Sequence, residues 1–272
     1  MRNVPPHPAH GYWRCAHWEL LPLRRLQPPP AGRPECRGAP VPSELSSTGV
    51  KVLPPRDEAE LLARARAWAG ATIGELAAAH QQPVPRDLRR HKGWLGELVE
   101  TALGASAGSR PVPDFTALGI ELKTIPVNEQ GRPCESTHVC TVTLGDLIGQ
   151  RWQSSTVRLK LSRVLWMPVE SCEDRPLGAR RLGQALVWSP DAVQESVLRA
   201  DWEEHMELLT TGRFDELDAR LGDYLQIRPK AANSRVLTAA GDSGGAPAAT
   251  LPRGFYLRPS FTHLLLSTGS KP

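Results

Sequence analysis

The alternation of apolar and polar positions predicts three helices in the first part of the folded region. Residues 57–69 carry acids in the first turn and then apolar side chains at helical spacing. The segment Thr72 to Glu75 has the form of a capping box and predicts the start of a second helix. A third helix is predicted over Trp94–Leu103, with Gly104 ending it.

Strand-sized apolar runs follow, and one long helix separates them. Ser189 as N-cap and Pro190 at the first helical position predict the start of that helix. Helices first, then a mixed sheet with helices on its faces, favour an α/β or α+β architecture. The predicted strands are a hairpin-like pair within 111–126 and the runs at 139–144, 163–170, 224–230 and 254–258, and residues 241–249 (GDSGGAPAA) are predicted to form a loop.

The first 55 residues differ from the rest of the chain. They hold twelve of the 26 prolines, so we expect an extended, disordered segment before a folded domain over residues 56–272. Cys15, His17 and Cys36 are metal-ligand types, but their spacing matches no zinc pattern. An alternative interpretation is that translation starts further in, at Val50 or Val52, and that the preceding residues are not made.

Composition is typical of a globular protein, with 40% hydrophobic and 23% charged residues. No apolar run approaches the roughly 20 residues that cross a bilayer, and the N-terminus has no apolar signal segment. The five cysteines form no C-x-x-C pair, which favours a reducing compartment. We therefore expect a cytoplasmic protein that does not bind membranes.

The net charge of +4 says little, but its distribution says more. Residues 151–163 carry four basic side chains and no acid, whereas residues 191–223 hold ten acids and three basic residues. From Arg228 onward there are six basic residues and one acid, Asp242. Two basic segments around an acidic one are typical of a polyanion-binding surface, although scattered solvated charge explains the same pattern.

The run PVPDFTALGIELKTIP places charges where a buried strand would carry apolar side chains. In a strand, Glu121 and Lys123 share one face, and a turn through residues 115–119 would bring Asp114 back to them. The two carboxylates and the Leu122 backbone carbonyl would make a hard-oxygen site for Mg²⁺. The alternative is a structural ion pair between Glu121 and Lys123 on a solvated strand. The P-D…E-x-K pattern is the signature of a large nuclease superfamily.

Longer blocks around this motif resemble the MutH family, the strand-directed endonucleases of methyl-directed mismatch repair. The resemblance is carried by KGWLGELVETALGASAGSRPVPDFTALGIELKTIPVNEQGRPCESTHVC, RVLWMPVE, WSPDAVQESVLRADWEE, YLQIRPKAANSRVLT and LPRGFYLRPSFT. It runs from about Asp57 to about Leu266. It implies a restriction-endonuclease-like fold, in which helices flank a central mixed sheet and two lobes surround a DNA cleft.

The resemblance also implies the activity. It is Mg²⁺-dependent nicking, with Mn²⁺ able to substitute, of the unmethylated strand at hemimethylated GATC in double-stranded DNA. A monomer does this, switched on by MutL, which MutS recruits at a mismatch. The family's catalytic residues fall on Asp114, Glu121 and Lys123, and a further glutamate near the metal falls on Glu100. For Glu100, a plain surface charge is the alternative.

The resemblance implies the DNA contacts as well. Arg228 and Lys230 suit the acceptors N7 and O6 of guanine, and Pro229 between them fixes the backbone. Tyr256 matches a tyrosine near adenine N6, where a methyl group would collide with the ring. The remaining implied roles are Glu135 as an acceptor from the amino groups of cytosine or adenine, and Lys92 and Lys160 as contacts to phosphate or supports of the active site. For Lys160 a plain basic rim is the alternative, and for Tyr256 an amphipathic residue at the sheet edge.

The chain departs from the family at three places. The proline-rich segment before residue 55 has no counterpart, and the C-terminus ends in HLLLSTGSKP where relatives continue with an apolar helical tail linked to the MutL response. Cys134 and His138 replace apolar residues near the Glu135 loop.

Other functions stay open at this point. A restriction-type enzyme that cuts both strands at GATC would use the same chemistry. A single Asp/Glu/Lys set would then have to act as a dimer or by two successive nicks. A DNA-binding or MutL-binding module without catalysis is the alternative from another class, and the complete triad argues against it.

Overall fold

The computed structural model describes residues 52–88, 90–142, 147–172, 174–230, 238–239, 249–250 and 252–269. All of them lie in Ser47–Pro272, one of the two units into which the chain divides. The predictions for the first 51 residues and for most of the loop at 241–249 fall outside the described residues. The boundary near residue 55 therefore stays a prediction.

The three predicted N-terminal helices are confirmed. They are α1 (Glu58–Ala67), α2 (Ile73–Ala79) and α3 (Trp94–Leu103). Thr72 and Glu75 form the capping box that the sequence predicted. Gly104 ends α3 in the left-handed conformation, with φ of 82°, and a side chain there would meet the carbonyl of Leu53.

The first sheet is mixed and has the order β1-β3-β4. Strand β1 (Glu121–Val127) runs parallel to β3 (Val164–Glu170), which pairs antiparallel with β4 (Leu186–Trp188). A parallel pair needs a long crossover, and here the chain passes through the second sheet between β1 and β3. The predicted strand at 163–170 is confirmed, but residues before Glu121 contribute only an isolated bridge to the expected hairpin.

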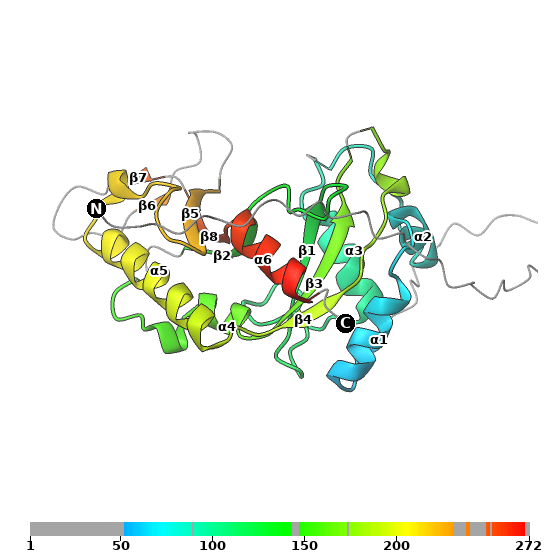
Figure 1. The fold of residues 1–272 in the computed structure, drawn as a ribbon, viewed down its shortest axis with the longest axis horizontal. Helices are drawn as coiled ribbons and strands as arrows, with labels where there is room; N and C mark the ends of the chain where they lie inside the picture. The colour runs from blue at the N-terminus through cyan, green and yellow to red at the C-terminus, as the bar shows by residue number, and fades with distance from the viewer. Residues whose placement is uncertain are drawn as a thin grey trace, which may run out of the picture. The chain divides into compact units, whose positions relative to one another are not determined.

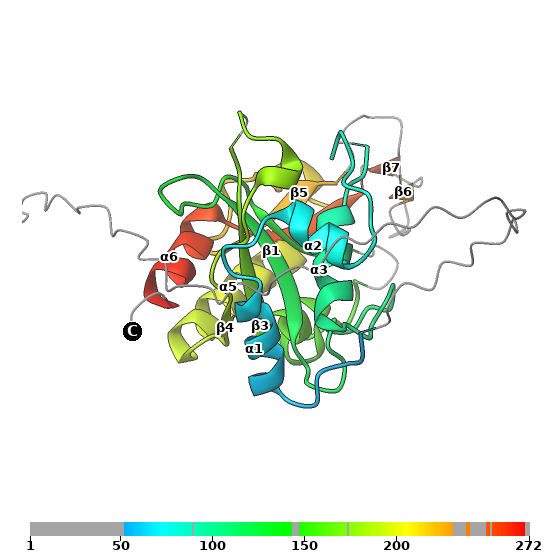
Figure 2. The same ribbon diagram turned by 90° about the vertical axis from the view of Figure 1, so that its right-hand side faces the viewer.

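The two faces of this sheet pack into two different hydrophobic clusters. Leu165 and Met167 of β3 lie in the cluster with α1, α2 and α3. Val164 and Trp166 lie in the cluster with the helices α5 (Ala192–Thr210) and α6 (Pro259–Gly269). This split follows from the alternation of side chains along a strand. Figure 1 shows α1 to α3 gathered on one side of β1 and β3, and Figure 2 shows the same strands between α3 and α6.

The second sheet is antiparallel and has the order β2-β8-β5. It consists of β2 (Thr137–Thr141), β8 (Arg253–Leu257) and β5 (Leu225–Pro229), with an irregular register between His138 and Cys140. The strand predicted at 139–144 thus begins two residues earlier, and residues 143–146 lie outside the described part. A short pair joins β6 (Thr238–Ala239) to β7 (Ala249–Thr250).

Three further helices complete the described part: α4 (Thr156–Leu161), α5 (Ala192–Thr210) and α6 (Pro259–Gly269). The predicted N-cap of the long helix was wrong. Asp191 caps α5 in a capping box with Gln194, so Pro190 precedes the cap and is not the first helical residue. The Ser189 hydroxyl accepts a hydrogen bond from Arg163 at 3.0 Å. Short 3₁₀ helices lie at Trp152–Ser154, Leu177–Ala179 and Phe214–Glu216.

The predicted architecture, a central mixed sheet with flanking helices, is confirmed. The arrangement of two lobes around a DNA cleft stays a prediction. Within the described ranges, no helix is both long and apolar enough to cross a membrane.

Candidate active site and nucleic-acid interface

A tight turn before β1 brings Asp114 back to the strand. Phe115 and Ile120 are buried and form an antiparallel bridge, and Gly119 between them adopts a φ of 66°. The Asp114 carboxylate accepts a hydrogen bond from the backbone N–H of Leu122 at 2.8 Å. The turn that the sequence predicted between Asp114 and Glu121 is therefore present.

Two ammonium groups meet the Glu121 carboxylate. Lys123, two residues along the same face of β1, donates to Oε1 at 2.7 Å. Lys160 of α4 donates to Oε1 at 2.8 Å and to Oε2 at 3.1 Å. The Glu121 side chain is 2% exposed and both lysines are 15% exposed. A buried carboxylate is tolerated there because two cations offset its lost hydration.

The backbone of β1 directs one carbonyl toward Asp114. The N–H of Glu121 donates to the Arg163 carbonyl beside β3 at 3.0 Å, whereas the N–H of Leu122 points to Asp114 on the other side. The N–H and C=O of a strand residue point the same way, and the direction alternates along the strand. The Leu122 carbonyl therefore also lies on the Asp114 side of β1.

Glu100 of α3 belongs electrostatically to the same cluster. Burial first, and then the negative charges of Asp114 and Glu121, raise the pKa of Glu100 to about 7. Burial and the Glu121 charge likewise raise the pKa of Asp114. Crowded carboxylates with raised pKa values mark a place where a bound cation would relieve their repulsion.

The donor set fits a divalent ion held by few protein ligands. Asp114 and Glu121 supply carboxylate oxygens and Leu122 supplies a carbonyl, which are the hard ligands that Mg²⁺ prefers. Across the described ranges, no three His, Cys, Asp or Glu side chains are grouped closely enough to hold a metal. The candidate metal ligands are therefore the carboxylates of Asp114 and Glu121 and the Leu122 carbonyl, and Glu100 is not among them.

The second sheet has one apolar and one polar face. Leu225 and Ile227 of β5 pack into the core, so Gln226 and Arg228 lie on the opposite face. On that face the register places Tyr256 of β8 between His138 of β2 and Gln226 of β5. The rings of His138 and Tyr256 meet edge to face, with centroids 5.1 Å apart.

The two predicted guanine-reading cations lie exposed at the end of β5, and each is hydrogen-bonded to a hydroxyl. Arg228 donates to Ser136 Oγ at 3.2 Å, and Lys230 donates to Thr141 Oγ1 at 2.6 Å. Gln226, which is 5% exposed, also donates to Ser136 Oγ, at 2.7 Å. Ser136 directly precedes β2 and Thr141 is its last residue, so the two hydroxyls lie at opposite ends of that strand.

The polar face of the second sheet and the carboxylate cluster are electrostatic neighbours. Burial first, and then the charges of Lys123, Lys230 and Lys160, lower the pKa of His138 to about 4. Lysines of both groups thus act on one imidazole, which is neutral at physiological pH. Charged residues also act on Tyr256. Burial raises its pKa most, the Arg228 charge lowers it and the Glu135 charge raises it.

Two predicted contacts are not brought into either cluster. Lys92 is exposed just before α3, and within the described part of the chain it makes no hydrogen bond or ion pair. Glu135 is exposed in the segment before β2 and acts on Tyr256 only through its charge. As far as the described residues show, both side chains are exposed to solvent.

Sequence reasoning missed the polar residues that surround the two predicted guanine-reading cations. Gln226 was detectable in principle, because YLQIRPK alternates buried and polar positions and Gln226 shares the face of Arg228. Ser136 and Thr141 carried no local signal. Their partners lie 92 and 89 residues away, so only the pairing of both strands with β8 reveals them.

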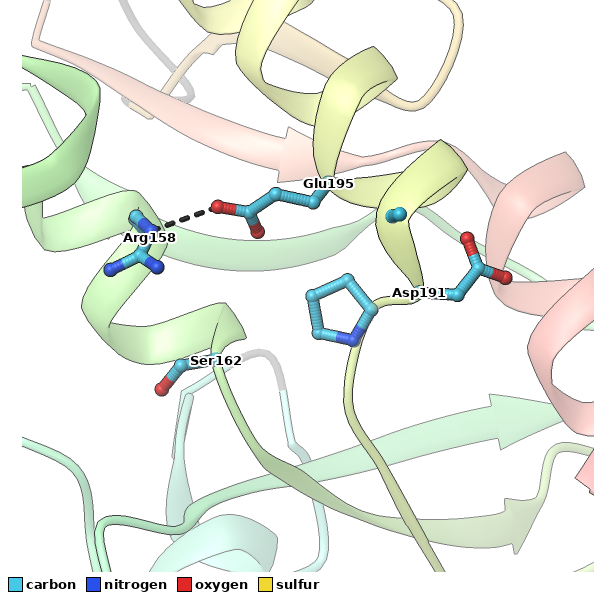
Figure 3. A pocket seen from close by; sticks show the side chains of 6 residues that line it. Arg158, Ser162, Asp191 and Glu195 are labelled. Carbon is cyan, nitrogen blue, oxygen red and sulfur yellow. Dashed lines mark hydrogen bonds and ion pairs between the residues drawn. The ribbon is translucent and has the colours of Figure 1, made fainter.

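A shallow hollow between α4 and α5 lies apart from these groups. Its lining includes Arg158, whose guanidinium points to Glu195 of α5 and pairs with it at 2.8 Å (Figure 3). None of the predicted catalytic or DNA-contacting residues lines it. The lining residues are Arg158, Ser162, Pro190, Asp191, Ala192 and Glu195.

Comparison with known proteins identifies the family. Residues 103–201 match the family described as DNA mismatch repair enzyme MutH. The chain is 55% identical over 214 residues to the DNA mismatch repair protein MutH of Klebsiella pneumoniae subsp. pneumoniae, an alignment that covers 79% of this chain and 93% of that protein. The MutH proteins of Pectobacterium atrosepticum (51% over 223 residues, 82% and 96% covered) and Vibrio parahaemolyticus (53% over 212 residues, 78% and 94% covered) are similar.

A central mixed sheet with this family match defines an endonuclease of the restriction-endonuclease-like class. The chain belongs to the MutH family and is a DNA mismatch repair endonuclease.

Proposed function

We propose that this endonuclease nicks the unmethylated strand at hemimethylated GATC in a reaction that requires Mg²⁺. The observation that carries the proposal is the convergence of Asp114, Glu121 and Lys123 at the start of β1, with Lys160 added from α4. The family membership supports both the reaction and the repair pathway.

Asp114, Glu121 and the Leu122 carbonyl would hold the metal, and Mn²⁺ would bind the same oxygens. When bound, the ion would stabilise charge on the phosphodiester and make a bound water more acidic. Lys123, whose amino group lies 2.7 Å from Glu121, would orient that water or help to deprotonate it. Glu100 adds a carboxyl that can hold a proton near neutral pH, which suits an acid–base role beside the cluster.

The polar face of the second sheet would read the sequence. Arg228 and Lys230 donate hydrogen bonds, and guanine N7 and O6 accept them. Pro229 between them fixes the backbone, and Glu135 would accept from cytosine N4 or adenine N6. Tyr256 would lie against adenine N6 and exclude a methyl group there.

Phosphate contacts and partners complete the proposal. Lys92 would contact the DNA backbone, and Lys160 would do so or support the cluster. The DNA that the enzyme binds is double-stranded, and its activator is MutL, acting downstream of MutS. We expect it to work as a monomer in the cytoplasm, with one nick per binding event. A restriction-type enzyme that cuts both strands is the alternative.

The test is a supercoiled plasmid with one hemimethylated GATC, incubated with Mg²⁺ and the purified full-length protein. We expect open circles as the first product, formed much faster with MutL and ATP. Linear DNA as the first product would favour cutting of both strands. A specific gel shift with unchanged plasmid would mean that the chain binds its site without cleaving it.

A second experiment addresses the metal directly. We expect isothermal titration calorimetry to detect Mn²⁺ or Mg²⁺ binding that Asp114→Ala removes and that Glu129→Gln, an exposed loop substitution, leaves unchanged. Absence of any uptake that depends on Asp114, with and without DNA, would contradict the assigned ligands.

A further inference from the structure

The two cations proposed to read guanine are held by uncharged partners. Arg228 and Lys230 are exposed, and among the described residues neither forms an ion pair. Their hydrogen-bonding partners are the hydroxyls of Ser136 and Thr141. A carboxylate in those places would neutralise the cation and compete with the base. A hydroxyl orients the cation and leaves its charge available.

The Ser136 hydroxyl is itself anchored by a buried group. Gln226 is almost fully buried, so its amide must find a partner, and it donates to Ser136 Oγ at 2.7 Å. The Ser136 oxygen to which Arg228 donates, at 3.2 Å, is therefore held in place by Gln226 of the sheet. Gln226 and Arg228 are two residues apart on one face of β5, so a single oxygen orders both side chains.

The geometry leaves Arg228 able to contact a base. A guanidinium has five N–H donors, one is used by Ser136, and a bidentate contact to guanine needs two. Long cationic side chains lose considerable rotamer freedom when they bind, and a side chain already held in one direction loses less. Thr141 gives Lys230 the same restraint from the last residue of β2.

We propose that Ser136 and Thr141 are positioning residues for sequence recognition: they hold Arg228 and Lys230 in the direction from which these cations contact the GATC bases. The role rests on the proposed function, because it requires that both cations read bases. In this role, β2 and the residue before it order the two cations at the end of β5.

The test is a double-mutant cycle on nicking of a hemimethylated GATC oligonucleotide. We expect Ser136→Ala to lower kcat/KM roughly fivefold, mainly through KM, a low value for a hydrogen bond to a charged group because Arg228 is exposed to solvent. In an Arg228→Ala background the same change should cost less than twofold, because there is no guanidinium left to position. A purely structural role through Gln226 would cost the same factor in both backgrounds, and that result would overturn the proposal.

A parallel cycle uses Thr141→Val, which removes an exposed hydroxyl at nearly constant size, with Lys230→Ala. The same pattern is expected: a loss of a few-fold that disappears without Lys230. If Ser136→Ala does not fold, the cycle of Thr141 and Lys230 tests the proposal by itself. Thr211→Val is the matched control, since its hydroxyl bonds only within α5, and it should leave kcat/KM unchanged.

One further measurement separates this role from the proposed function. Arg228→Ala should nick GATC and a site with one changed guanine at more similar rates than the parent does. If it keeps the parent's preference, base reading by Arg228 fails and the positioning role fails with it. If the preference is lost while the effects of Ser136→Ala and Arg228→Ala are additive, only the positioning role is overturned.

Discussion

The ammonium group of Lys160 donates to both oxygens of the Glu121 carboxylate, at 2.8 and 3.1 Å, across 39 residues of sequence. This contact ties α4 to β1, and it makes Lys160 part of the cluster rather than of a solvated basic rim. Lys123 also donates to this carboxylate, so two ammonium groups face its single negative charge.

Removal of Lys160 should weaken the fold as well as the activity. In Lys160→Met the buried Glu121 keeps only Lys123 as a partner, and we expect the free energy of unfolding to fall by about 2 kcal/mol. Arg158→Met on the same helix breaks a partly exposed pair with Glu195 and should cost less than about 1 kcal/mol. Urea unfolding without metal measures both, and equal losses would show that the buried pair has no special weight.

Lys123 should matter for chemistry more than for binding. We expect Lys123→Ala to reduce nicking by roughly a hundredfold or more, the usual contribution of a positioned proton donor or acceptor. Affinity for GATC DNA in a gel shift should change little, because the lysine is 15% exposed and paired with Glu121. Loss of DNA binding at low salt would contradict this assignment.

Glu100 predicts a pH dependence of stability. Its pKa is raised to about 7, so the folded protein binds this proton more tightly than the unfolded chain does. The resulting stability is complete below pH 4.5 and is lost as the pH rises through 7. After allowance for solvent screening, we expect Glu100→Gln to be more stable than the parent at pH 8 by on the order of 1 kcal/mol.

Urea unfolding at pH 5.5 and pH 8 without metal tests that prediction. The gap between the parent and Glu100→Gln should widen with pH, whereas Glu129→Gln in an exposed loop should show a constant gap. A gap that narrows toward pH 8 would mean that Glu100 is stabilised as a carboxylate.

Asp201 should be a large contributor to stability outside the active site. It is 6% exposed on α5 and accepts three backbone N–H groups just before and at the start of β5, from Asp223 at 2.9 Å, Tyr224 at 2.7 Å and Leu225 at 2.8 Å. Asp201→Ala leaves these donors without their partner, and we expect a loss of about 3 kcal/mol in urea unfolding. Glu203→Ala on the exposed face of α5 should cost less than about 1 kcal/mol.

Tyr256 should carry the discrimination between methylated and unmethylated adenine. We expect Tyr256→Ala to raise nicking of fully methylated GATC relative to hemimethylated GATC by about tenfold, because the methyl group no longer meets a ring. Tyr224→Phe is the matched control, since that ring stacks on Phe261 at 4.0 Å away from the polar face. An unchanged ratio in Tyr256→Ala would assign methylation sensing to another group.

Local patterns were sufficient for several features of this protein. The capping box of Thr72 and Glu75, the end of α3 at Gly104 and the meeting of Asp114 with β1 all depend on residues within a few positions of each other. Their geometry is set by helix capping, by glycine's access to positive φ and by strand alternation, which operate over short stretches of chain.

Tertiary structure alone decided the rest. Ser189 has the chemistry of an N-cap, but in the folded protein its hydroxyl accepts a hydrogen bond from Arg163 of a distant segment. Asp191, two residues later, caps the helix. Lys160 joins the carboxylate cluster and Ser136 joins the polar face of the second sheet only because separate strands and helices pack together. A side chain's partners across 39 or 92 residues depend on that packing, which no spacing in the sequence records, whereas the Asp-Glu-Lys motif could be read directly because its residues lie within ten positions of one another.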